Sequence, residues 1–140
     1  MATPSNKQRR FLERATDQAT KHDSGGRVKI WAIAEKNSSV IAEEGNSYLK
    51  SAQTSRLAPY SNGHLTMHAE IAVLASLAHK NPTKGMTLYI GGYGRSGSLA
   101  NTKPCTLCMA ALKKSGVFKR IVYYKDNVPV VEDLTTTTSD

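Results

Sequence analysis

Residues in two short segments of the chain could carry out chemistry together. Residues 68–70 read His-Ala-Glu, and residues 104–108 read Pro-Cys-Thr-Leu-Cys. Cys105 and Cys108 are the two cysteines of the chain. Two residues between cysteines are typical of a metal site or a redox pair rather than of a structural disulfide. Because residues three apart share one face of a helix, both thiols can point toward one ligand.

We expect each segment to open a helix, with the N-terminal ends of the two helices meeting. The first helix is predicted over Thr66–Lys80, with Thr66 as N-cap, and the second over Pro104–Ser115, with the proline in its first turn. One imidazole nitrogen and two sulfurs would then converge. Three protein ligands leave a fourth tetrahedral position for water, which is typical of catalytic zinc. The helix dipole should lower the pKa of both thiols and so favour the thiolates that bind metal.

Glu70 is predicted to transfer protons beside the metal rather than to bind it. It stands two residues from His68, so its side chain leaves the helix in another direction. Other interpretations remain for each residue. The histidine could be a cap or be solvated, and Glu70 could compensate the helix dipole. The cysteines could form a thioredoxin-like redox pair, although such a pair gives no reason for His68 and Glu70.

The two segments resemble the signature of the cytidine and deoxycytidylate deaminase superfamily, His-x-Glu followed by Pro-Cys-x-x-Cys. The resemblance covers roughly residues 27–124. It implies that His68, Cys105 and Cys108 bind Zn²⁺. It also implies that Glu70 takes a proton from the zinc-bound water and passes it to the base nitrogen and then to the leaving ammonia.

Further residues are candidates for substrate binding. The resemblance implies that the backbone of Ala69 holds the base, and Asn46 resembles the asparagine of the family that contacts the sugar. His64 could face the substrate or cap a loop, and Tyr124 could stack on a base or pack in the core. The candidate substrate-binding residues are therefore Asn46, His64, Ala69, Pro104 and Tyr124.

The rest of the pattern predicts a single α/β domain over residues 1–140, with residues 1–7 and 135–140 disordered. Strands alternate with amphipathic helices, and the first two strands form a hairpin, so the sheet is mixed. The predicted order is helix 8–21, strands 27–35 and 39–45, helix 66–80, strand 87–90, helix 104–115, and strands 120–124 and 128–132. Together with the resemblance, this order implies a three-layer α/β/α cytidine-deaminase-like fold with a mixed sheet of about five strands.

Composition and charge bear on location and on partners. The chain has 140 residues and a net charge of +8, which favours an anionic partner such as a nucleotide or a nucleic acid. It has no run of apolar residues long enough for a membrane span and no apolar signal-peptide region, so we expect a cytoplasmic protein without a membrane partner. The pattern Gly92-x-Gly94-x-x-Gly97 resembles a dinucleotide-binding fingerprint, but no helix is predicted directly after it. We interpret it as a loop.

The substrate is predicted from the branch of the family that the chain resembles. A histidine as first ligand resembles the deoxycytidylate, tRNA-adenosine and nucleic-acid cytosine deaminases rather than the free-nucleoside enzymes. About 16 residues follow Tyr124, too few for the additional helix and strand of the tRNA enzymes. We therefore expect a cytosine-type nucleotide or nucleoside, deoxycytidylate-like, and the resemblance also implies a homo-oligomer. The alternatives are a cytosine deaminase acting on single-stranded nucleic acid, and an inactive zinc-binding or nucleic-acid-binding module.

Overall fold

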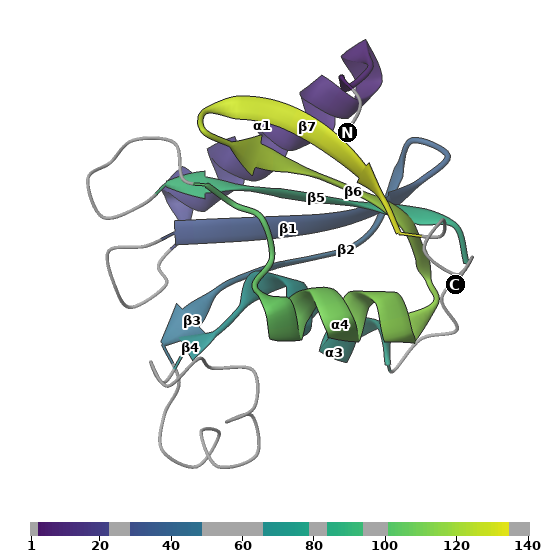
Figure 1. Ribbon diagram of the computed structural model, residues 1–140. Helices are drawn as coiled ribbons and strands as arrows, with labels where there is room; N and C mark the ends of the chain where they lie inside the picture. Colours follow the sequence, from purple (N-terminus) through teal and green to yellow (C-terminus); the bar gives the residue numbers. More distant parts are fainter. Residues whose placement is uncertain (1–2, 23–28, 49–65, 79–83, 94–100, 135–140) are drawn as a thin grey trace.

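The computed structural model describes residues 3–22, 29–48, 66–78, 84–93 and 101–134. The labels of helices and strands are those of Figure 1. Among these residues no helix is both long enough and apolar enough to cross a bilayer.

A five-stranded mixed sheet forms the centre of the molecule (Figure 1). Its strand order is β2-β1-β5-β6-β7, and only β5 and β6 run parallel. The strands are β1 (Lys29–Lys36), β2 (Ser39–Gly45), β5 (Met86–Tyr93), β6 (Phe118–Lys125) and β7 (Val128–Asp133). The structure confirms the predicted mixed sheet and the hairpin at its start.

Two tight hairpins set the register of the outer strands. Asn37 and Ser38 join β1 to β2, and Asp126 and Asn127 join β6 to β7. All four residues have positive φ, between 53° and 68°. Two-residue hairpin turns need this left-handed backbone, which asparagine and aspartate tolerate better than most residues.

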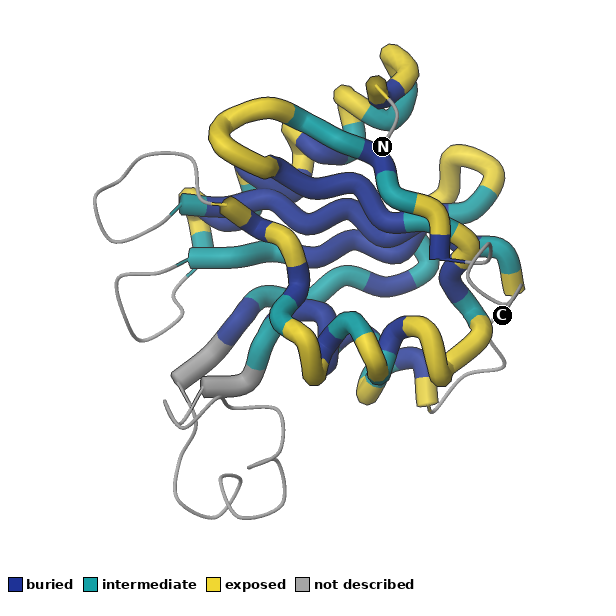
Figure 2. The backbone as a smooth tube through the Cα atoms, viewed as in Figure 1, coloured by how far each residue is buried: buried dark blue, intermediate teal, exposed yellow. Residues whose placement is uncertain are grey.

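Helices cover both faces of the sheet, so the molecule has three layers (Figure 1). Helix α1 (Asn6–Lys21) lies on one face, and α3 (Ala69–Leu77) and α4 (Thr106–Ser115) lie together on the other. Side chains alternate along the strands, and each face has its own apolar cluster. Tyr89 and Val122 pack beneath α1, whereas Leu88 and Ile121 pack beneath α3 and α4. Figure 2 shows the buried strands between these layers. The predicted α/β/α architecture is confirmed.

Helix α1 begins two residues earlier than predicted, at Asn6, with Ser5 as its N-cap. The Ser5 hydroxyl accepts from the backbone N–H of Gln8 at 3.2 Å, and the Gln8 side chain accepts from the backbone N–H of Ser5 at 2.8 Å. This reciprocal pair is a capping box, which satisfies N–H groups at the helix start. Residues 1–2 and 135–140 lie outside the described part of the chain.

The segment before α3 also differs from the prediction. Thr66–Met67 form a short strand, β4, which pairs antiparallel with β3 (Ser47–Tyr48). Thr66 is therefore not the N-cap of the helix. That position belongs to His68, and the helix begins at Ala69.

Candidate active site

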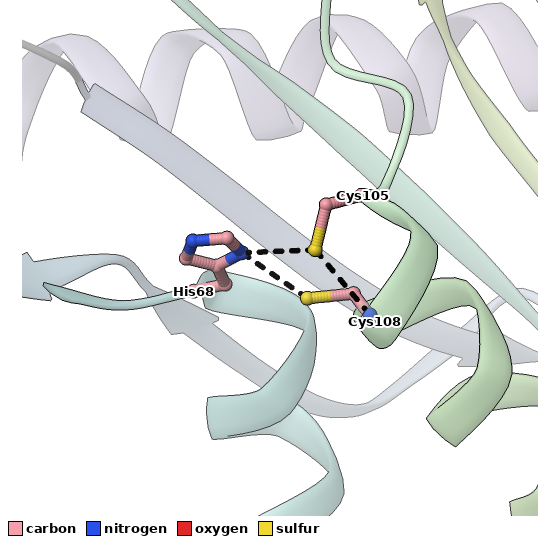
Figure 3. A group of neighbouring side chains, drawn as sticks. All are labelled: His68, Cys105 and Cys108. Atoms are coloured by element: carbon pink, nitrogen blue, oxygen red, sulfur yellow. Dashed lines mark hydrogen bonds between the residues drawn. The ribbon is translucent and has the colours of Figure 1, made fainter. Parts of the chain in front are cut away.

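Three metal-ligating side chains converge where α3 and α4 begin (Figure 3). His68 is the N-cap of α3, Cys105 is the N-cap of α4, and Cys108 lies one turn into α4. The Nδ1 atom of His68 lies 3.1 Å from Sγ of Cys108 and 3.7 Å from Sγ of Cys105. All three ligand atoms lie within 4.8 Å of one another. The predicted meeting of the two helix starts is confirmed.

Cap geometry aims the two cysteines at the same point. Cys105 has an extended backbone, with φ −66° and ψ 169°, and its sulfur accepts from the backbone N–H of Cys108 at 3.4 Å. The carbonyl of Cys105 accepts from Met109 at 2.8 Å and so begins the helix. At the other end, Gly116 adopts a left-handed conformation with φ 71° and ends α4.

Thr102 fixes the chain that leads into α4, and the sequence analysis missed it. Its hydroxyl donates to the carbonyl of Ile90 at 2.7 Å and accepts from the backbone N–H of Tyr124 at 2.8 Å. Its own N–H donates to the carbonyl of Tyr124 at 2.9 Å. Thr102 is buried and lies three residues before Cys105, so it connects the first cysteine to the ends of β5 and β6.

The electrostatics of the Cys108 thiol differ from the prediction. Cys108 is fully buried, and its burial, followed by the charge of nearby Glu70, raises the pKa of its thiol. Removal from water therefore outweighs the helix dipole at Cys108. A cation bound at this point would replace the thiol protons, because metal ligation and thiol deprotonation are coupled.

The donor set fits a zinc ion. One imidazole nitrogen and two thiolates are ligands that zinc prefers, and three protein ligands leave a coordination position for water. Zn²⁺ is therefore the cofactor that these residues would hold.

Glu70 lies in the first turn of α3, close to the ligands but not among them. Its side chain is buried, and this burial raises its pKa to about 7, against a smaller opposing effect of a backbone hydrogen bond. Its charge helps to raise the pKa of the Cys108 thiol, so the two groups lie near each other. A carboxyl group with this pKa can exchange a proton near neutral pH.

Asn46 lies beside the metal-binding segment, at the point where the chain leaves the main sheet. The register of β3 with β4 pairs Ser47 with Met67, so one further step places Asn46 opposite His68. The backbone N–H of Asn46 donates to Ile30 at 2.9 Å, and its side-chain Oδ1 accepts from the Ile30 N–H at 2.8 Å. The Asn46 side chain thus takes the place of the Asn46 backbone carbonyl as hydrogen-bond acceptor for β1. The backbone carbonyl of Asn46 instead contacts Nε2 of His22. Its contact with a sugar stays a prediction.

Two of the other candidate substrate-binding residues lie next to metal ligands, and one lies outside the described residues. Ala69 follows His68 directly and is fully buried, and Pro104 is buried directly before Cys105. Both therefore adjoin the metal ligands, whereas their substrate contacts stay predictions. His64 lies outside the described residues, as do Gly94 and Gly97 of the glycine pattern.

Tyr124 lies on the α1 side of the sheet, and its contact with a substrate stays a prediction. Its side chain packs with Leu12 and Val122 in the apolar cluster beneath α1. Tyr123, not Tyr124, faces the layer of α3 and α4. Because successive side chains of a strand point to opposite faces, the two tyrosines could not be distinguished without the sheet.

Comparisons with known proteins support this description of the site. Residues 5–125 match the family described as the cytidine and deoxycytidylate deaminase zinc-binding region. Among solved structures, the chain is similar to the dCMP deaminase of cyanophage S-TIM5 in its apo form, with 19% sequence identity and a TM-score of 0.59. That match covers 85% of this chain and 82% of the other. The same enzyme in complex with dCMP and dUMP matches with 18% identity and a TM-score of 0.56, over 90% and 88% of the two chains. A search of curated proteins gave no significant match.

Proposed function

Because this chain belongs to the cytidine and deoxycytidylate deaminase zinc-binding family, we propose that it hydrolytically deaminates a cytosine-type nucleotide or nucleoside, deoxycytidylate-like, and releases ammonia. The observation that carries the proposal is the convergence of His68, Cys105 and Cys108 beside the buried carboxyl group of Glu70. A binding module would need the ligands, but it would not need a buried acid next to them.

The reaction divides between the metal and the residues of the chain. Held by His68, Cys105 and Cys108, zinc would act as a Lewis acid that makes water a sufficient nucleophile at neutral pH. The carboxylate of Glu70 would accept a proton from that water and deliver it to the ring nitrogen next to the amine-bearing carbon. A second proton transfer through Glu70 would let the amine leave as ammonia while the carbon retains the oxygen.

Two observations favour a phosphorylated substrate. The net charge of +8 attracts anions. The similar cyanophage enzyme is a dCMP deaminase that was crystallised with dCMP and dUMP. The same charge would also suit single-stranded nucleic acid, which is therefore included in the test. A cytoplasmic location and a homo-oligomeric state stay predictions.

The proposal is tested by measuring bound zinc and ammonia release on the same preparation. The substrates are cytidine, deoxycytidine, their monophosphates, adenosine monophosphate and a short single-stranded oligonucleotide. Glu70→Gln keeps the shape of the side chain, and the matched control is Glu13→Gln, an exposed residue of α1. We expect one zinc per chain in all three proteins, with turnover of a cytosine mononucleotide reduced about 10²- to 10⁴-fold only by Glu70→Gln.

Two outcomes would contradict the proposal. If Glu70→Gln retains full turnover, the assigned proton carrier is wrong. If the zinc-loaded protein releases ammonia from the oligonucleotide alone, the substrate class is nucleic acid rather than a free nucleotide.

A further inference from the structure

A second pocket lies far from the metal ligands, on the opposite face of the sheet. It has a volume of about 160 Å³ and is lined by the start of α1, the end of β1, and the starts of β5 and β6. The metal ligands lie at the starts of α3 and α4, which cover the other face of the sheet (Figure 1). The sheet therefore separates this pocket from the candidate active site.

Basic side chains dominate the lining of this pocket. Lys7, Lys36, Lys119 and Arg120 all line it, and Glu35 is the one acidic residue among the described lining residues. These five groups sum to a charge of +3. The nearby Asp133 offsets this charge only weakly, because its Oδ1 lies 3.8 Å from Nε of Arg120, too far for a hydrogen bond, and its side chain is 56% exposed.

The carboxylate of Glu35 already accepts hydrogen bonds from groups within the protein. Its Oε1 accepts from the Tyr89 hydroxyl at 2.9 Å, and its Oε2 accepts from the backbone N–H of Ser38 at 2.8 Å. Lys7 lies 3.1 Å from Oε2. Glu35 is 3% exposed, so it lies at the floor of the pocket with its carboxylate oxygens already hydrogen-bonded.

Lys36 and Lys119, at the rim of the pocket, have N–H groups that can donate to a ligand. Among the residues that the structure describes, Lys36 gives one hydrogen bond, to the carbonyl of Lys84, although an ammonium group carries three N–H donors. The Lys119 side chain is exposed. The first turn of α1 also opens onto the pocket and contains no acidic residue, so its positive dipole end adds to the same field.

The size of the pocket restricts its occupant. A cavity of about 150 Å³ holds a molecule the size of benzene, which is smaller than a nucleotide but larger than a tetrahedral oxyanion. Tetrahedral oxyanions suit a mixture of ammonium and guanidinium donors. Chloride would bind less strongly than an oxyanion to a planar guanidinium fork such as that of Arg120.

We propose that this pocket binds a phosphate group, either as inorganic phosphate or as the phosphate of a small phosphomonoester. It is a second anion site, separate from the site of deamination. The lining of the pocket alone supports this site, which is independent of the function proposed above.

The experiment measures binding of inorganic phosphate and of glycerol phosphate to the zinc-loaded protein by calorimetry, at constant ionic strength set with chloride. The pocket variant is Lys36→Gln/Lys119→Gln. The matched control is Lys113→Gln/Lys114→Gln, which removes the same charge from the exposed end of α4. The single variant Lys119→Gln replaces the double variant if the latter does not fold.

We expect saturable binding to the wild type and to the control, and at least tenfold weaker binding to the pocket variant. Tighter binding of glycerol phosphate would identify a phosphomonoester as the occupant, and tighter binding of inorganic phosphate would identify the free ion. The absence of saturable binding to the wild type would overturn the proposal. Equal affinity of the pocket variant and the control would overturn it as well.

Discussion

Replacing Thr102 should weaken both the fold and the metal site, and the size of the effect can be worked out from its contacts. Thr102→Val keeps the shape of the side chain but removes the hydroxyl. The N–H of Tyr124 then loses its acceptor, and the carbonyl of Ile90 loses a donor. A buried polar group left without its partner costs about 1–3 kcal/mol. Two such groups give about 2–6 kcal/mol, so we expect Thr102→Val to lower the free energy of unfolding by that amount.

Thr102→Ser provides the matched control, because it keeps the hydroxyl and loses one methyl group. Loss of a buried methyl group costs about 1 kcal/mol. Urea denaturation of the zinc-loaded proteins would give both values, since the midpoint and the slope together define the free energy of unfolding. Competition with a chelator would give the zinc affinity. It should fall for Thr102→Val, because Cys105 lies three residues downstream.

The comparison of valine with serine decides whether the reasoning holds. If Thr102→Val is no less stable than Thr102→Ser, the two hydrogen bonds do not hold the segment. If stability falls while zinc affinity is unchanged, Thr102 stabilises the sheet without positioning Cys105.

Three further predictions follow from the site and its surroundings. A chelator should lower the melting temperature of the wild type but not of Cys108→Ser, since a ligand that binds only the folded state stabilises it; calorimetry with and without chelator would test this. The pKa of Glu35 lies below its ordinary value of 4.5, because hydrogen bonds outweigh the opposing effect of burial. Glu35 therefore stabilises the fold above that value, and the stabilisation is lost as pH falls through the lower, folded pKa. Glu35→Gln should then reduce stability at pH 7 and flatten its decline in acid, as read from urea midpoints across the pH range; a decline as steep as that of the wild type would exclude this role. In Gly91→Ala the new methyl carbon would lie 2.8 Å from the backbone nitrogen of Thr16, so the substitution should cost about 1–3 kcal/mol in urea denaturation, and unchanged stability would contradict this close packing of α1 on β5.

The sequence was sufficient for the fold class and for the metal ligands because both depend on local patterns. Apolar alternation marked the strands, and a pair of cysteines three apart can lie on one helix face wherever the helix is placed. His68 was identified because the two cysteines alone do not complete a donor set for zinc. A third ligand therefore had to come from another segment of the chain. The capping box of Ser5 and Gln8 was also visible in the sequence, as a serine followed three residues later by glutamine.

The residues that the sequence analysis missed or misplaced depend on which parts of the chain become neighbours. Thr102 appears as an ordinary loop threonine until β5 and β6 end beside it. Tyr124 differs from Tyr123 only in the face of β6 from which it projects. Thr66 is a good capping residue that instead pairs with Tyr48, a partner far away in the sequence.

The contact between α3 and α4 also has a consequence for the order of folding. His68 and Cys105 are 37 residues apart in sequence, and closing a chain segment of that length costs roughly 3 kcal/mol of entropy. Cys105 and Cys108 are close together even in an unfolded chain. We therefore expect the cysteine pair to capture metal early and the histidine to join only when α3 docks against α4. Excess zinc during refolding should then act on an early step, the capture of metal by the cysteine pair that Thr102 helps to place.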